Sequence, residues 1–512
     1  MEAKLRTDQI NYLKKISDVV FTHEETAEII VPDAMPDIIE VVDAEGTVIL
    51  RSKEAESGRL TFSGMVSATV IYQPEDGSAL CRLEVSMPFS ATQDVPEVTA
   101  ESQLCAVVRI GSLDARMINS RKALVRADVV VEAAAYAPAE IVWANRIEED
   151  DGAGIELLRK QMELSLVTQV REKSFVLADE FVIPSGKPPI EEILKTSIDV
   201  LCDDVKAVGN KLIFKGNATI RLLYTGGGEE PIPLEFAAAF SQIMEMEGEM
   251  ESVSADIRLM LTNCYVENGS SVAAENAAIA VEMHMVAQAV CREMREIPYI
   301  SDVYSTRFDL NEERAPLFLE SEESPFTAQA ESRENVEVAD PVQRVLDTNF
   351  KTGKAYWTEE NGAMRLTVSV GASALYMSDA GKVCGVSRKF EVSGISDMEP
   401  GVDYQVTAQV QSDAQALPAG SGVEFRIPVH FHVRPRRKFR TDAVSGVRWD
   451  EEQARDLSVL PSIVVHHVAS GENLWMMAKK YCSTEELIQT ANNLDPGASP
   501  ERGQLFIIPK KR

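Results

Sequence analysis

The amino-acid sequence predicts a mainly β protein with α+β elements, built from three repeated antiparallel, sandwich-like units and a small βααβ segment. Three observations predict this fold. The chain of 512 residues repeats itself with a period of 152, the repeats contain long runs of alternating apolar and polar residues, and the last fifty residues differ in pattern. At roughly 100–200 residues per domain, this length also predicts several domains.

The repeat is clearest in a segment that ends in the same way three times. RLTFSGMVSATVIY ends at Tyr72, KLIFKGNATIRLLY at Tyr224 and MRLTVSVGASALY at Tyr376, so successive copies lie 152 residues apart. Between 32–72 and 184–224, 10 of 41 aligned pairs are identical. This similarity indicates that one structural unit occurs several times.

Apolar residues occupy every second position of this segment. In the first copy they are Leu60, Phe62, Gly64, Val66, Ala68, Val70 and Tyr72. Strict alternation over 13 residues predicts a long strand with one buried face. Gly64 and its counterpart Gly216 indicate a bulge or a close backbone approach, whereas the third copy has Val368 there.

Two segments show helical rather than strand spacing. Near the N-terminus, Ile10, Leu13, Ile16 and Val20 recur every three to four residues, and IELLRKQMELSLVTQV over 155–170 has a similar pattern. We therefore expect an amphipathic helix at the start of the first unit and another helix leading into the second.

These patterns divide the chain into five parts. We expect a first unit with its N-terminal helix over 1–145, a second unit with its leading helix over 155–298, a divergent third unit over 299–434, a basic linker over 435–462 and a small domain over 463–512. The linker begins with the basic run RPRRKFR and shows no strong periodicity.

Composition excludes several classes of partner. Acidic residues outnumber basic ones 81 to 51, and this net charge of −30 repels phosphate, so we expect no nucleic-acid partner. No apolar run reaches the roughly 18 residues of a membrane span, and the N-terminus lacks the apolar core of a secretory signal. The seven cysteines are scattered without a CxxC pair. We therefore expect a cytoplasmic protein without a transmembrane segment, disulfides or a zinc site.

No recognised catalytic motif is present. The chain lacks GxxxxGK, HExxH and GxSxG, so we expect no catalytic residues, no cofactor and no enzymatic activity. His430 and His432 could share one face of a strand and hold a metal ion. The alternate positions there are apolar, however, so a solvated polar face is the simpler interpretation and we expect no metal.

The C-terminal residues predict a strand, two helices and a closing strand. The strands are expected near 464–468 and 505–508. Asn473 is placed to cap the first helix, and Ser483 with Glu486 has the spacing of a capping box for the second.

This segment resembles the LysM module in residue type, spacing and length. The shared positions are Val468, Gly471, Leu474, Ala478, Tyr481, Leu487, Asn493, Gly503, Leu505 and Pro509. The resemblance implies a groove that binds N-acetylglucosamine polymers such as peptidoglycan, between the loop after the first strand and the loop after the second helix. The positions that would line it are Ser470, Gly471, Glu472, Asn473, Leu474, Trp475, Met476, Asn493, Asp495 and Pro496. The family often has Asp-Thr where this chain has Glu472 and Asn473.

The repeats also resemble a known family. The proline-rich opening, the Gly-to-Tyr strand and the phrase ISDVYST at 300–306 are similar to the SPOCS repeat of sporulation and spore-coat proteins. Three such units followed by one LysM module resemble the SipL-like spore-coat morphogenetic proteins. The resemblance implies a mother-cell scaffold at the forespore surface, whose LysM module binds a coat ATPase of the SpoIVA type.

Two interpretations of the module remain open. One is a protein-binding role in a coat scaffold, and the other is binding of peptidoglycan in the cell wall or spore cortex. The first helix carries Trp475, Met476 and Lys479 away from the expected core face, and an aromatic ring, a methionine and a cation suit a protein partner. Local packing of Trp475 is the simpler alternative.

Overall fold

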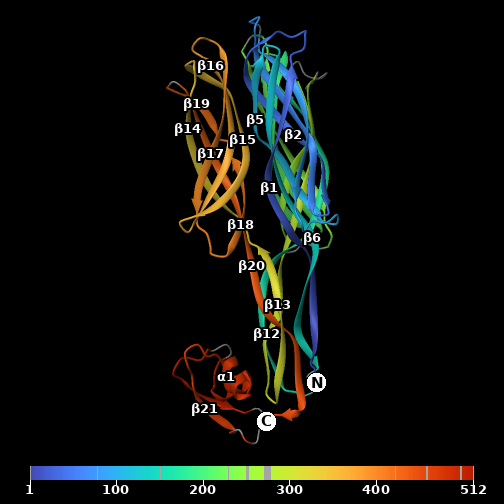
Figure 1. Ribbon diagram of the computed structural model, residues 1–512, viewed down its shortest axis with the longest axis vertical. Helices are drawn as coiled ribbons and strands as arrows, with labels where there is room; N and C mark the ends of the chain where they lie inside the picture. Colours follow the sequence, from blue (N-terminus) through green and yellow to red (C-terminus); the bar gives the residue numbers. More distant parts are fainter. Residues whose placement is uncertain are drawn as a thin grey trace.

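The computed structural model describes residues 2–77, 79–149, 152–228, 230–248, 253–269, 278–420, 422–456, 459, 461–495 and 499–510. Figure 1 shows an elongated molecule with a broad head of strands at one end, a narrower stalk, and a small segment with helices beside the far end of the stalk. Both termini lie at this stalk end. In the described part of the chain, no helix is long and apolar enough to cross a membrane.

Unit one consists of two antiparallel three-stranded sheets that share a core. Their orders are β1-β6-β5 and β2-β3-β4. The strands are β1 (Lys4–Ile30), β2 (Ile38–Glu56), β3 (Arg59–Pro74), β4 (Cys81–Asp94), β5 (Gln103–Asn119) and β6 (Lys122–Glu149). Phe62 and Phe89 of one sheet and Val129 of the other lie in the same apolar cluster. The prediction of a mainly β protein made of antiparallel units is confirmed.

Unit two repeats this plan with the sheet orders β11-β12-β7 and β10-β9-β8. Its strands are β7 (Ile155–Val182), β8 (Glu192–Val208), β9 (Lys211–Thr225), β10 (Ile232–Glu245), β11 (Val253–Gly269) and β12 (Ala278–Ser305). The phrase ISDVYST therefore closes unit two, whereas the predicted boundary placed it at the start of unit three.

Unit three keeps the plan but interrupts two strands. One sheet is β15-β16-β17, and in the other β13, β14, β18 and β19 all pair with the long strand β20. The strands are β13 (Phe308–Glu322), β14 (Phe326–Glu337), β15 (Val342–Glu360), β16 (Ala363–Ser378), β17 (Val383–Ser396), β18 (Val402–Val410), β19 (Gln415–Ala419) and β20 (Gly422–Ala454). Unit three thus extends beyond the predicted end at 434.

The two segments predicted as helices are strands. The N-terminal segment forms β1 and pairs with β6, and 155–170 belongs to β7, which pairs with β12. Each strand contains one extra residue, Ile16 in β1 and Thr168 in β7, which switches the face that is buried. The stalk also buries both faces, since the neighbours Tyr12 and Leu13 pack into different apolar clusters. Both effects replace the period of two with a spacing that imitates a helix.

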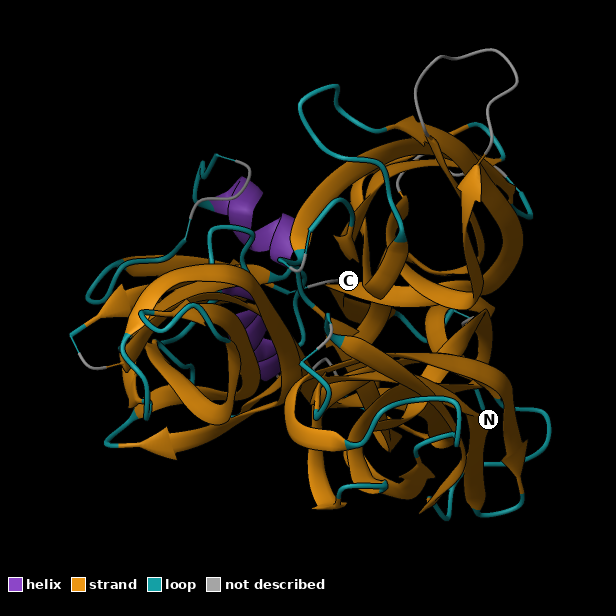
Figure 2. Cartoon of the chain, turned by 90° about the horizontal axis from the view of Figure 1, so that it is seen from above, coloured by secondary structure: helices purple, strands orange, loops and turns teal. Residues whose placement is uncertain are grey.

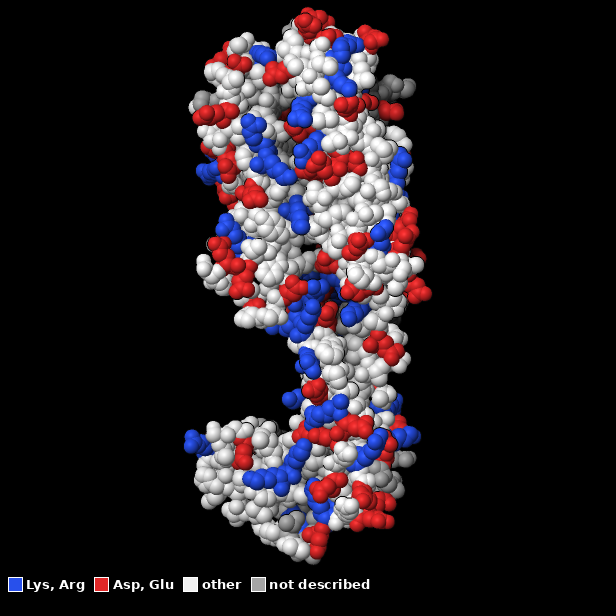
Figure 3. All heavy atoms as spheres, viewed as in Figure 1, with Lys and Arg blue, Asp and Glu red and all other residues white. Residues whose placement is uncertain are grey.

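The predicted basic linker over 435–462 is also wrong for most of its length. β20 continues to Ala454, and it pairs with β13 and β18 through the basic run. Figure 3 shows basic side chains gathered where the head narrows into the stalk. They are matched by acids on neighbouring strands, for example Arg436 by Asp403. Pairing with neighbouring strands therefore orders the basic run RPRRKFR, which the sequence alone predicts to be a solvated linker.

Gly64 and Gly216 each lie opposite a bulge in the neighbouring strand, β2 or β8. A Cβ at Gly64 would lie 2.2 Å from the carbonyl oxygen of Ile49, and one at Gly216 would lie 2.0 Å from that of Leu201. The prediction of a bulge with a close backbone approach is confirmed at both positions.

Unit three meets the same constraint differently. Val368 occupies the glycine position and is fully buried, while Gly353 in the bulge of β15 occupies the position that corresponds to Leu201. A Cβ on Gly353 would lie 2.7 Å from the carbonyl oxygen of Ser369. In unit three, the glycine that allows this close backbone approach therefore lies in β15, whereas in units one and two it lies in the central strand, β3 or β9.

The repeated prolines and tyrosines are joined by a hydrogen bond. The hydroxyl of Tyr72 donates to the carbonyl oxygen of Pro36 at 3.0 Å, and Tyr224 donates to Pro188 at 2.9 Å. Each bond fastens the proline-containing opening of its unit to the end of the central strand.

The three units pack around a common axis, which Figure 2 views from above. Asp43, Lys195 and Asp347 are equivalent residues of the three units, 152 positions apart, and they meet at this axis. The ammonium of Lys195 lies 2.5 Å from Asp43 and 2.6 Å from Asp347. Equivalent apolar side chains surround this trio: Val42, Leu194 and Leu346, together with Ile71, Leu223 and Leu375. The sequence repeat therefore builds a head with approximate threefold symmetry from a single chain.

Candidate binding site at the end of the stalk

The C-terminal module, residues 463–510, follows the stalk. It contains β21 (Ile463–His467), α1 (Leu474–Tyr481), α2 (Glu485–Ala491) and β22 (Leu505–Pro509), and the two strands pair antiparallel. Leu474, Ala478, Ile488, Phe506 and Ile508 are buried in its small core.

The two helices begin at side-chain caps. Asn473 accepts a hydrogen bond from the backbone N–H of Met476 at 2.8 Å, as predicted. The second helix is capped by Thr484, which accepts from the N–H of Leu487 at 3.2 Å. The predicted capping box at Ser483 is therefore wrong, because the Ser483 hydroxyl donates instead to the carbonyl oxygen of Pro509.

Three of the predicted groove residues have internal roles. Glu472 accepts hydrogen bonds from the backbone N–H of Ala469 at 2.8 Å and from His466 at 2.7 Å, and these bonds lower the pKa of Glu472. Asn473 caps α1, and Leu474 lies in the module core. Their side chains hold the loop and the helix in place.

The other predicted groove residues lie mostly at the surface. Ser470, Gly471, Asn493 and Asp495 are exposed in the two loops, and half of the Met476 surface is exposed. Gly471 has a positive φ of 82°, which a turn at this point requires. Pro496 lies outside the described residues.

The structure contradicts the expectation that Trp475 lies off the core. Only 6% of its surface is exposed, and its indole N–H donates to Asp302 Oδ2 at 2.7 Å. Its ring meets that of Tyr304 edge-on, with centroids 4.8 Å apart. The simpler alternative, packing of Trp475, is therefore correct, but the packing partner belongs to the stalk.

Asp302 and Tyr304 are functional candidates that the sequence did not reveal, although both belong to the phrase ISDVYST. Burial opposes ionisation of Asp302, but hydrogen bonds from Lys479 and Trp475 outweigh it and hold the pKa of Asp302 below its usual value. The only sequence signal was the phrase itself, which gives no indication of its partner.

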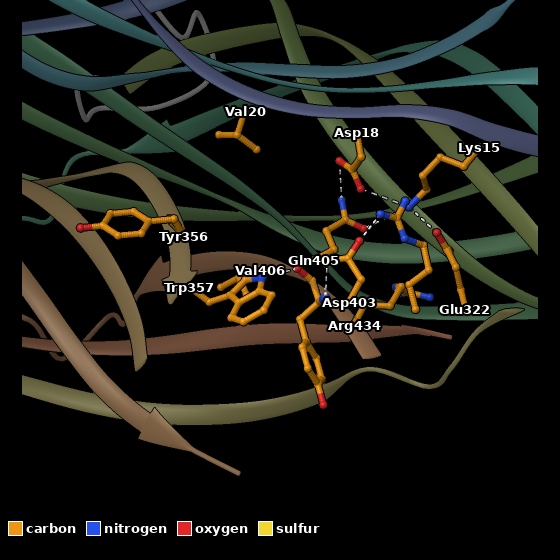
Figure 4. A pocket seen from close by; sticks show the side chains of 13 residues that line it. Lys15, Asp18, Val20, Glu322, Tyr356, Trp357, Asp403, Gln405, Val406 and Arg434 are labelled. Carbon is orange, nitrogen blue, oxygen red and sulfur yellow. Dashed lines mark hydrogen bonds and ion pairs between the residues drawn. The ribbon is translucent and has the colours of Figure 1, made fainter. Parts of the chain in front are cut away.

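A second candidate is a cavity of about 280 Å³ where the stalk meets unit three. Figure 4 shows that its charged residues point toward one another. Lys15 lies 3.2 Å from Asp18 and also contacts Glu322, and Arg434 lies 2.7 Å from Asp256. Because these groups neutralise one another, the cavity is best explained as a joint between units. In the residues that the structure describes, no three His, Cys, Asp or Glu side chains are grouped to hold a metal ion.

Comparison with known proteins gives one match. A family model described as SipL, SPOCS domain, matches residues 37–118 and 189–268. Two segments of this chain match the SPOCS domain. They begin 152 residues apart, and each runs from near the start of the second strand of its unit into the fifth. The match relates the chain to sporulation and covers less than half of it. No curated protein and no solved structure shows a significant match.

Proposed function

We propose that the chain is a non-enzymatic scaffold of endospore formation. Its C-terminal module, which we regard as LysM-type, binds a coat morphogenetic ATPase of the SpoIVA type and anchors the basement layer of the coat to the forespore surface. The two SPOCS matches carry this proposal, because they relate the repeated units to sporulation.

The shape of the molecule supports a scaffold. The three-unit head and the C-terminal module lie at opposite ends of the stalk (Figure 1), so the chain offers two well-separated surfaces. The proposal places the protein in the mother-cell cytoplasm at the forespore surface. Fractionation of sporulating cells tests this, with recovery in the coat fraction expected. Recovery outside the membrane of vegetative cells would contradict it.

Met476 gives the sharper test of the binding surface. Because half of it is exposed on α1, Met476→Glu should leave the module folded and weaken binding of the ATPase roughly tenfold. Biolayer interferometry with the intact chain measures this loss. Glu486→Gln, on the exposed side of α2, is the matched control and should change nothing. Equal binding by the folded Met476→Glu variant would exclude α1 as the binding surface.

The alternative is a LysM module that binds peptidoglycan. The exposure of Ser470, Gly471, Asn493 and Asp495 in the two loops favours it, since a glycan groove would use these loops. Sedimentation of the intact chain with purified sacculi distinguishes the two functions. The scaffold proposal predicts that the chain stays in the supernatant.

A further inference from the structure

The C-terminal module is held against the stalk through one face of α1. Both oxygens of Asp302 are used, since Oδ2 accepts from Trp475 and Oδ1 lies 2.6 Å from the ammonium of Lys479. The Tyr304 hydroxyl donates to the carbonyl oxygen of Ser483 at 2.8 Å, and Leu158 packs against the same cluster. The contact therefore combines a shared carboxylate, an aromatic pair and an apolar edge.

In the described residues the stalk consists of three two-stranded ribbons, β1 with β6, β7 with β12, and β13 with β20. Of these ribbons, that of unit two carries Asp302 and Tyr304. The three ribbons can be aligned through the apolar cluster at the end of the stalk. Each ribbon contributes two residues to it, three positions apart: Ala144 and Ile147, Ile300 and Val303, and Val444 and Val447. In this alignment Asp302 corresponds to Arg146 and Gly446, and Tyr304 to Glu148 and Arg448. Neither alternative pair offers a carboxylate followed by an aromatic ring, so the site is not a general consequence of the repeat.

The contact also contains an unfavourable part. Glu156 of β7 acts on Glu485 of α2, and burial together with this like charge raises the pKa of Glu485. Arg455, just after β20, links the module to the stalk. Its guanidinium lies 2.5 Å from Asp309 and 2.6 Å from Cys482 Sγ. A contact that includes a like-charge pair is displaced by a competing surface more readily than one without such a pair.

Two docked residues, Trp475 and Lys479, lie on the same helix as Met476, which is assigned to the partner, and their aromatic ring and cation also suit a protein surface. Trp475 and Lys479 face the stalk, whereas Met476 on the same helix stays half exposed. A partner that uses the aromatic ring and the cation must therefore replace the contacts with Asp302 and Tyr304. Its apparent affinity is reduced by the fraction of molecules in which the module is docked.

We propose that docking of α1 on Asp302 and Tyr304 is an autoinhibitory contact that masks the partner-binding face of the C-terminal module. This proposal rests on the proposed function for its partner, but the docking itself does not. Release of the module exposes Trp475 and frees the ammonium of Lys479 from Asp302, while the head and stalk stay folded. Partner binding and stalk docking then exclude each other.

The test compares the intact chain with its Asp302→Ala variant. Hydrogen exchange of the α1 amides measures docking without any partner, and we expect it to be at least fivefold faster in the variant while exchange in the head is unchanged. Affinity for the purified ATPase should rise about tenfold. Glu148→Ala, at the position of unit one that corresponds to Tyr304, is the matched control and should alter neither quantity.

Each result decides a different point. Unchanged α1 exchange in folded Asp302→Ala would show that the docked state is not populated and would overturn the proposal. Faster exchange with equal or weaker ATPase binding would overturn autoinhibition while leaving docking in place. If neither the wild type nor Asp302→Ala binds the ATPase, the proposed function fails, and faster α1 exchange would still establish docking.

Discussion

Single residues explain the similarity among the three copies of the repeat. Tyr72 and Tyr224 fasten the opening of their units through a proline carbonyl, and Gly216 lies where a side chain would strike the neighbouring backbone. In unit three Val368 takes the glycine position, and the close approach is made instead by Gly353 against the carbonyl oxygen of Ser369. The copies therefore share a geometry, which different residues can satisfy.

Gly216→Val should destabilise unit two by about 1–3 kcal/mol, because a Cβ there would overlap the carbonyl oxygen of Leu201 and the ring of Phe240. Urea unfolding of the intact chain measures the change. Gly228→Val is the control, since a Cβ at Gly228 has no neighbour within 4 Å. Equal stability of the Gly216 variant and wild type would contradict the close-approach interpretation.

Adding Leu201→Gly to Gly216→Val should recover part of the lost stability, because the pair then reproduces the arrangement of Gly353 and Val368. A double-mutant cycle in urea gives the coupling free energy, which we expect to be favourable by about 1 kcal/mol. Additive losses would show that the two arrangements are not interchangeable.

Tyr224→Phe should cost about 1 kcal/mol, because the carbonyl of Pro188 loses its hydroxyl donor at 2.9 Å. Thermal unfolding monitored by circular dichroism measures the effect. Tyr265→Phe serves as the control, because the Tyr265 hydroxyl accepts a hydrogen bond from Asn263 at the exposed surface. Matching losses in both variants would exclude a special role for the Tyr224–Pro188 bond.

At the scale of elements, the sequence predicts strands well where one face is buried. β3, β9 and β16 show the period of two over most of their lengths. The prediction fails in β1 and β7, because bulges and two-sided burial in the stalk remove that period. It also fails in β20, whose basic residues are paired with acids that are adjacent in the fold but far away in the sequence.

The contact among units could not be predicted, because it depends on residues far apart in sequence. Burial opposes the charge on Lys195, but Asp43 and Asp347 outweigh it and raise the pKa of Lys195. Lys195→Met should therefore leave the buried carboxylate of Asp43 and the partly buried carboxylate of Asp347 without this cation, and destabilise the head by about 3–5 kcal/mol. Urea unfolding measures this loss. Lys206→Met, at an exposed ion pair of the same strand, should have little effect.

At the scale of the whole molecule, the sequence indicated repeated units and a distinct C-terminal segment but not how they are joined. The groove residues came from a family resemblance, whereas Asp302 and Tyr304 meet Trp475 only after the stalk has formed. The joint between stalk and unit three likewise unites Lys15, Glu322 and Arg434 from distant segments.

From the charged residues between the stalk and unit three, we expect the protein to lose stability in acid. Burial opposes ionisation of Glu322, but Lys15 and Arg292 outweigh it and lower the pKa of Glu322 to about 2. Since the folded-state pKa lies below the unfolded value near 4.5, the stabilisation is complete above that value and is lost as the pH falls toward 2. Urea unfolding between pH 7 and pH 2 should show this decline. In Glu322→Gln the free energy of unfolding should depend less on pH over this range, whereas Glu320→Gln should behave like the wild type.

The most direct test of the account is a calorimetric titration of the intact chain with a purified SpoIVA-type ATPase, alongside a titration with chitin oligomers. We predict saturable binding of the ATPase that weakens in Met476→Glu, and no heat of binding with the oligomers. Micromolar binding of the oligomers together with no binding of the ATPase would contradict the proposed scaffold and favour a cell-wall-binding module.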